Sequence, residues 1–184
     1  QGQLLSWTTL EKGGILVGET GRRFGNEDLG YSGFAAHVLD QGEFAWAIYD
    51  ARIHGIAEAE EEYAEMATMG AVSWAETPAA LAAKVGLDAD GLTETIVAYN
   101  SAALDDGTDE FGRTAFALAP LQPPFAAVRV KPGLFHTQGG VLVDNEARVR
   151  RSTGGTVPNL FAGGGAAAGI SGRYGCLLYT SDAA

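Results

Sequence analysis

Cysteine and positive charge are both scarce in this sequence. Cys176 is the only cysteine among 184 residues, and 12 Lys and Arg stand against 23 Asp and Glu, for a formal net charge of −11. A single cysteine excludes an internal disulfide and a metal site built from several cysteines. The acidic balance excludes nucleic acid as a partner, because such partners require basic surfaces. We expect no metal.

Long apolar runs are also missing. No run reaches the roughly 18 residues that a membrane-spanning helix needs, so we predict no membrane span. The sequence shows no secretion or transit signal, and we expect a cytoplasmic protein, although the chain starts at Gln1 rather than at a methionine. Its 46% apolar and 19% charged residues are typical of a folded chain with one core.

Glycine is abundant instead. The 26 glycines are about 14% of the chain, twice the usual roughly 7%. Many of them lie between 139 and 175, next to apolar segments. Glycine lets the backbone approach a ligand closely, so this part of the chain is interpreted as a cofactor-binding segment rather than a linker.

The spacing of apolar residues predicts a mixed α+β or α/β fold. The clearest helix start is Thr77-Pro78, with threonine as the N-cap and proline in the first turn. We expect strands at 14–17, 44–50, 125–130, 140–144, 147–149 and 159–162, and helices at 32–41, 57–69, 78–85 and 88–104.

The last expected strand runs into Gly163-Gly164-Gly165-Ala166-Ala167-Ala168, which fits the dinucleotide pattern G-x-G-x-x-A. The acidic residue that should follow some twenty positions later is not present. The pattern alone therefore does not favour a self-contained NAD site.

Several spaced motifs together are more specific. They are His136-Thr137-Gln138-Gly139-Gly140-Val141-Leu142-Val143-Asp144, Val157-Pro158-Asn159-Leu160-Phe161-Ala162-Gly163-Gly164, Gly169-Ile170-Ser171-Gly172, Gly14-Ile15-Leu16-Val17, Gly21-Arg22-Arg23-Phe24-Gly25-Asn26-Glu27 and Asp109-Glu110-Phe111-Gly112-Arg113. This set resembles the fumarate reductase/succinate dehydrogenase flavoproteins of the FAD-dependent oxidoreductase 2 superfamily, over nearly all of residues 10–175.

The resemblance implies a capping domain that covers substrate, and the C-terminal part of a Rossmann-like FAD-binding domain whose N-terminal half is missing from this incomplete chain. The expected division is a remnant or linker at 1–13, the cap at 14–128 and the FAD-binding part at 129–175. The residues it implies for FAD are Gly139, Gly140, Ala162, Gly163, Gly164, Gly165, Ser171 and Gly172.

The sequence departs from the fumarate-reducing members at three places. Tyr31, five residues after Asn26, stands where those members use an arginine to protonate substrate. Trp7 and Leu10 replace a Glu/Arg proton-relay pair, and Gly165 replaces a glutamate that contacts the flavin. With a tyrosine at this position, the sequence resembles the ketosteroid dehydrogenase branch, which acts on a C–C bond next to a ketone.

The resemblance thus implies the catalytic residues Tyr31, His136 and Arg173. Hydride exchange at a carbon β to a carbonyl needs a proton partner at the α carbon. A tyrosine hydroxyl can donate that proton unaided, whereas its action as a base needs a nearby cation, such as Arg173 or protonated His136.

Three functions remain open. The first is an FAD-dependent oxidoreductase acting on a small, apolar carbonyl compound, because few Arg or His are available to bind a dicarboxylate. The second is a fumarate-reductase-like reductase of a small unsaturated acid. The third is a non-catalytic fragment that binds no flavin.

The final nine residues, 176–184, match one reading frame of a common transposon-type sequencing adapter. We therefore expect a non-native tail after Gly175, which different codons in the coding DNA would contradict.

Overall fold

The computed structural model describes residues 5–105, 107–133 and 139–168. The chain divides into two compact units, 1–132 and 133–184, and each is described by itself. The tail at 176–184 lies outside the described residues.

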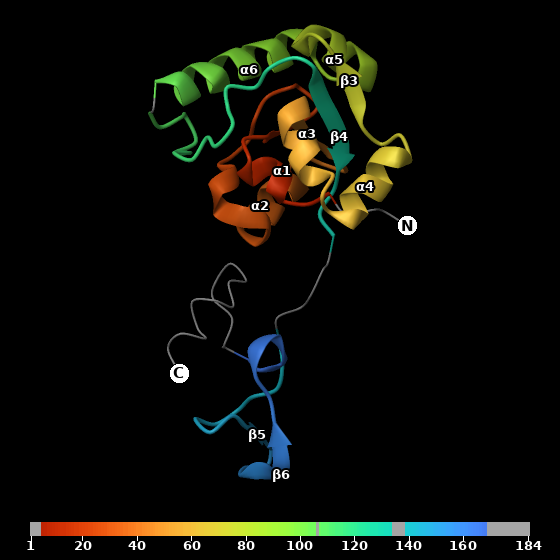
Figure 1. Cartoon of the computed structure of the whole chain (residues 1–184). Coiled ribbons are helices and arrows are strands. Elements are labelled where there is room, and N and C mark those ends of the chain that lie inside the picture. Colours follow the sequence, from red (N-terminus) through yellow and green to blue (C-terminus); the bar gives the residue numbers. More distant parts are fainter. Residues whose placement is uncertain (1–4, 106, 134–138, 169–184) are drawn as a thin grey trace. The chain divides into compact units, whose positions relative to one another are not determined.

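An antiparallel sheet forms the centre of the first unit. Its strand order is β1-β2-β4-β3, with bounds Ile15–Val17, Ala45–Asp50, Phe125–Val130 and Ser73–Ala75 (Figure 1). Ile48 in β2 pairs with Ile15 on one side and with Ala127 on the other. The central strand β2 is almost entirely buried, which explains why it reads as a continuous apolar run.

Three of the α-helices of this unit start at a side-chain cap. The Asp50 side chain accepts hydrogen bonds from the N–H groups of Arg52 and Ile53, and Thr77 and Asp88 cap the two later helices in the same way. The helices are α1 (Thr8–Glu11), η1 (Glu27–Leu29), α2 (Gly30–Leu39), α3 (Ala51–Ala57), α4 (Glu61–Thr68), α5 (Pro78–Val85) and α6 (Ala89–Leu104). Helices α5 and α6 pack together, and α5 contacts β3 and β4 (Figure 1).

Several elements differ from the sequence-based expectation. The helix expected at 57–69 starts later, as α4 at Glu61, because the chain is extended at Glu60 (φ −95°, ψ 124°). Helices α1 and α3 were not expected, and Ala57 is the last residue of α3. Strand β3 was not expected. It has three residues, too few for a period-2 pattern, and it forms by pairing with β4 at the edge of the sheet.

The first unit encloses a continuous apolar core. Its fully buried large side chains come from the sheet, from α2 and from α3 to α6, and include Phe34, Ile48, Ile53, Leu81 and Leu92. This burial is the dominant stabilising contribution for a unit of this size.

The second unit is a small β structure. Strands β5 (Arg148–Arg150) and β6 (Thr156–Phe161) pair antiparallel, and the 3₁₀ helix η2 (Gly164–Ala166) follows. The strand expected at 140–144 is reduced to isolated bridges at Val141 and Val143. Among the described residues of this unit, only Val149 and Ala167 are buried apolar residues.

None of the helices in the described ranges has both the length and the apolar character that crossing a membrane requires.

Candidate functional site

Tyr31 is the second residue of α2 and projects from the surface of the first unit. It is 53% exposed, and its hydroxyl makes no hydrogen bond with a described residue. The residue before it, Gly30, joins η1 to α2 with φ +72° and ψ 170°, a conformation that essentially only glycine adopts. The tyrosine is therefore presented at the start of a helix rather than used to fill the core.

The positions that hold a proton relay in the fumarate-reducing members are apolar here. Leu10 is 2% exposed and belongs to the core, and the Trp7 ring lies 5.9 Å from the Phe34 ring. These side chains hold no exchangeable proton suited to a relay, so they support packing beneath α2.

A buried ion network includes Glu27, which lies four residues before Tyr31. The Glu27 carboxylate accepts hydrogen bonds from the Leu16 amide (3.0 Å), from Arg23 and from Arg113 (3.2 Å). Arg23 also pairs with Asp109, and all four charged side chains are at most 4% exposed. Two positive and two negative charges cancel, which is the condition under which buried charges are tolerated.

The network also changes proton affinities. Burial acts to lower the pKa of Arg23, but hydrogen bonds and charge from Glu27 and Asp109 outweigh it and raise that pKa. Burial likewise acts to raise the pKa of Asp109, and hydrogen bonds from Arg23 and from the Arg113 amide hold it below the usual value. Both groups stay charged near neutral pH.

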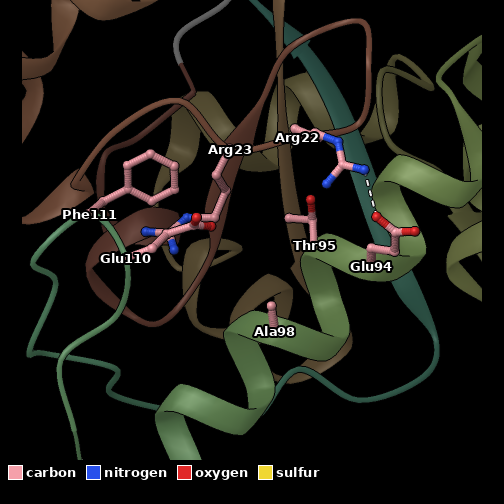
Figure 2. Close-up of a pocket in the computed structure, with 7 residues that line it drawn as sticks. All are labelled: Arg22, Arg23, Glu94, Thr95, Ala98, Glu110 and Phe111. Carbon is pink, nitrogen blue, oxygen red and sulfur yellow. Dashed lines mark hydrogen bonds and ion pairs between the residues drawn. The ribbon is translucent and has the colours of Figure 1, made fainter.

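Arg23 of this network also lines a surface cavity of about 330 Å³. Its lining residues are Arg22, Arg23, Glu94, Thr95, Ala98, Glu110 and Phe111 (Figure 2). Arg22 pairs with Glu94 at the surface, and the Arg23 guanidinium lies over the Phe111 ring, 5.0 Å from its centroid. Both arginines are thus already paired. Tyr31 does not line this cavity.

The glycine-rich turn of the second unit is open to a ligand. The N–H groups of Gly163, Gly164 and Gly165 donate to no acceptor among the described residues, and a Cβ at Gly163 or Gly164 would meet no atom within 4 Å. Ala162, by contrast, donates to the Ala147 carbonyl. Free N–H groups in a turn of this kind suit a phosphate or a polyol chain.

Gly140 has a structural reason to be glycine. A Cβ there would lie 1.9 Å from the Ala166 carbonyl oxygen, because Val141 bridges to Ala167 beside it. Gly139 is exposed. The predicted flavin contacts of these two glycines stay predictions.

Four predicted site residues lie outside the described residues: His136, Ser171, Gly172 and Arg173. Within the described ranges, no three His, Cys, Asp or Glu side chains are grouped so that they could hold a metal ion.

Arg23, Glu27, Asp109 and Arg113 lie in two of the sequence motifs, but the sequence analysis did not predict that they form one cluster. The available signal was their charge. The two short motifs contain three arginines and three acids, and such a balance is typical of an ion network when the motifs meet in space.

Comparisons with known proteins show the family of the chain. Residues 2–175 match the family model described as an FAD binding domain. An NADH:fumarate oxidoreductase from Klebsiella pneumoniae (strain 342) is 32% identical over 171 residues, which cover 92% of this chain and 18% of that protein.

Two solved structures are also similar. The open conformation of a flavocytochrome c3 fumarate reductase has a TM-score of 0.66 at 30% identity, covering 91% of this chain and 29% of that one. The 3-ketosteroid delta1-dehydrogenase from Sterolibacterium denitrificans has a TM-score of 0.62 at 26% identity, covering 86% and 34%. The chain therefore spans between 18% and 34% of the length of these relatives.

The match covers most of the chain, so the chain belongs to the FAD binding domain family. FAD is the cofactor of that family, and the exposed glycine turn with its free N–H groups fits it. The mixed helix and sheet fold agrees with the flavoprotein structures.

Proposed function

We propose that this chain is part of an FAD-dependent oxidoreductase that acts on a C–C bond next to a carbonyl, with Tyr31 as the proton-transfer residue. The observation that carries the proposal is the state of Tyr31. It is an exposed tyrosine with no hydrogen bond to a described residue, at the start of a helix and four residues after Glu27 of the buried ion network.

In this proposal the glycine turn holds the cofactor. The N–H groups of Gly163, Gly164 and Gly165 would bind the phosphate or ribityl part of FAD, together with Ser171 and Gly172. When bound, FAD supplies hydride exchange with the carbon β to the substrate carbonyl.

Tyr31 would hold a proton at its hydroxyl oxygen and exchange it with the α carbon. In the reductive direction the phenol gives its proton to that carbon and regains one from solvent. In the oxidative direction a cation must stabilise the phenolate, and His136 and Arg173 are the residues proposed for this role.

The surroundings of Tyr31 favour a neutral, apolar substrate. Leu29 is 43% exposed beside it, and the segment from Asp28 to Ala36 contains no Lys, Arg or His. A dicarboxylate would require paired cations. The ketosteroid dehydrogenase similarity supports this choice.

The second candidate is reduction of a small unsaturated acid. It is favoured by the similarity to the NADH:fumarate oxidoreductase and to the flavocytochrome c3 fumarate reductase. The arginine that this reaction uses in the resembling family is replaced by Tyr31, which is why we place it second.

A substrate comparison tests the two candidates. The full-length protein that contains this chain would be assayed with 4-androstene-3,17-dione and with fumarate. The first compound is bound in the solved structure of a 3-ketosteroid-delta4-(5alpha)-dehydrogenase to which this chain is similar. We expect turnover of the ketone, and Tyr31→Phe should lower its rate by roughly 10²–10⁴ with the flavin content unchanged. Turnover of fumarate alone would support the second candidate. A Tyr31→Phe rate within a few-fold of the unaltered enzyme would remove Tyr31 from the mechanism.

A further inference from the structure

The side chain of Asp28 is hydrogen-bonded to the loop that contains Thr114 and Ala115. Its Oδ2 accepts hydrogen bonds from the amides of Thr114 and Ala115, each at 3.3 Å, and its Oδ1 lies 3.5 Å from Nε of Arg113. Asp28 lies in η1, three residues before Tyr31. The carboxylate therefore joins two segments that are 86 residues apart in sequence.

The loop that contains Thr114 and Ala115 is itself fixed by the contacts of Arg113. Arg113 is 1% exposed and donates to the carbonyls of Leu10 and Gly14, each at 2.8 Å, and of Ala115 at 2.9 Å. Its guanidinium also pairs with Glu27. A guanidinium with partners around its plane has little freedom, so the loop gives Asp28 a fixed point of attachment.

The joint between Asp28 and Tyr31 is backbone alone. Gly30 has a positive φ, and a Cβ built on it would meet no atom within 4 Å, so no side-chain packing fixes this joint. The next attachment of α2 is the buried Phe34, one turn further on. Tyr31 lies between these two attachments, and its placement depends on both.

We propose that Asp28 is a positioning residue for Tyr31, acting through its hydrogen bonds to the Thr114 and Ala115 amides; this inference rests on the proposed function of Tyr31. Asp28 does not contact the reacting atoms in this arrangement. It fixes η1, the turn that leads into α2, so that the Tyr31 hydroxyl meets the substrate in one geometry.

The first test measures the tether in the 184-residue chain, without substrate. Amide hydrogen exchange at residues 29–32 would be compared for Asp28→Ala, Asp28→Asn and the control Asp90→Ala. Asp90 is an exposed acid in the first turn of α6 whose side chain makes no hydrogen bond to a described residue.

We expect Asp28→Ala to raise exchange at these amides by roughly tenfold, the effect of losing one or two hydrogen bonds. Asp28→Asn keeps one acceptor oxygen and should give a smaller increase. Asp90→Ala should leave these amides unchanged. Unchanged exchange in Asp28→Ala would overturn the proposal.

The second test uses the full-length enzyme and a double-mutant cycle. Asp28→Ala should lower kcat by roughly ten- to hundredfold, with KM and flavin content unchanged, as a misplaced catalytic group does. In the Tyr31→Phe background the same substitution should lower kcat no further.

An equal loss in both backgrounds would show that Asp28 acts on the fold in general and would overturn the positioning role. A Tyr31→Phe enzyme with normal turnover would instead overturn the proposed function and the catalytic part of this inference. The exchange result would still decide separately whether Asp28 tethers the segment.

Discussion

Glu27 is the residue at which several segments of the first unit meet. Its two oxygens accept from the β1 amide of Leu16, from Arg23 in the turn before η1 and from Arg113 in the distant loop. With only 1% of its side chain exposed, its charge is stabilised by these donors and not by water.

Neutralising Glu27 should therefore be costly. Glu27→Gln leaves Arg23 and Arg113 with one carboxylate fewer in a buried site, and we expect it to lower the free energy of unfolding by about 3–5 kcal/mol. Urea unfolding at pH 7 measures this change. The matched control is Glu94→Gln, which removes the exposed Arg22–Glu94 pair and should cost at most about 1 kcal/mol. Equal losses in the two variants would contradict a buried network.

The contribution of Asp109 to the free energy of unfolding should decrease at low pH. Its folded-state pKa lies below its ordinary value, so its stabilisation is complete above that ordinary value and is lost as the pH falls through the folded-state pKa. Asp109→Asn should reduce stability at pH 7, where Asp109 is charged.

Urea unfolding of both proteins from pH 7 down to pH 3 checks this dependence. The difference between the unaltered chain and Asp109→Asn should be constant near neutral pH and should shrink as the pH falls below about 4. A difference that stays constant down to pH 3 would show that the carboxylate charge is not what stabilises this site.

At the scale of elements, a chain of hydrogen bonds joins β2, α4 and α3. The hydroxyls of Tyr49 and Tyr63 are 2.7 Å apart, and Nδ1 of His54 is 2.7 Å from the Tyr63 hydroxyl. Nε2 of His54 lies 3.1 Å from the Glu58 carboxylate. Burial raises the pKa of Tyr49 and raises that of Tyr63 to about 12, so both hydroxyls keep their protons at neutral pH.

Tyr63 is the central member of this chain, and its removal should cost more than removal of the end member. Tyr63→Phe leaves the fully buried Tyr49 hydroxyl without its described partner, and we expect a loss of about 1–3 kcal/mol. Tyr49→Phe removes one hydrogen bond and leaves Tyr63 bonded to His54, so its loss should be about 1 kcal/mol. Thermal unfolding of the two variants gives the comparison. A larger loss in Tyr49→Phe would contradict this order.

At the scale of the whole molecule, the two units differ in how completely they bury apolar surface. The first encloses its own core, whereas the second leaves Val141, Leu142, Leu160 and Phe161 between 45% and 64% exposed. Among the described residues of the second unit, Val149 and Ala167 alone are buried apolar residues.

We therefore expect the 184-residue chain to purify without stoichiometric flavin. Its glycine turn offers free N–H groups, but the chain spans only 18% of the NADH:fumarate oxidoreductase and 34% of the ketosteroid dehydrogenase that it resembles. Absorbance near the flavin bands measures bound FAD, with the longer protein as the control. Stoichiometric flavin in the short chain would show that this part binds FAD by itself.

Local signals determined the elements with strong sequence patterns. The proline-led helix α5 and the strand β4, which follows Pro123-Pro124, have the bounds that were predicted from sequence. Cap residues and apolar spacing act within a few positions of the chain, so they can be read without knowing the fold. The motifs likewise indicated the flavoprotein family, which the family match confirms.

Tertiary structure decided the features that depend on distant partners. Strand β3 exists because β4 offers it an edge, and β4 remains in the first unit because it pairs with β2 and β3. The attachment of Asp28 to the Thr114 and Ala115 amides joins segments 86 residues apart in sequence. Hydrogen bonds and ion pairs act over a few ångströms in space, and sequence spacing carries no measure of that distance.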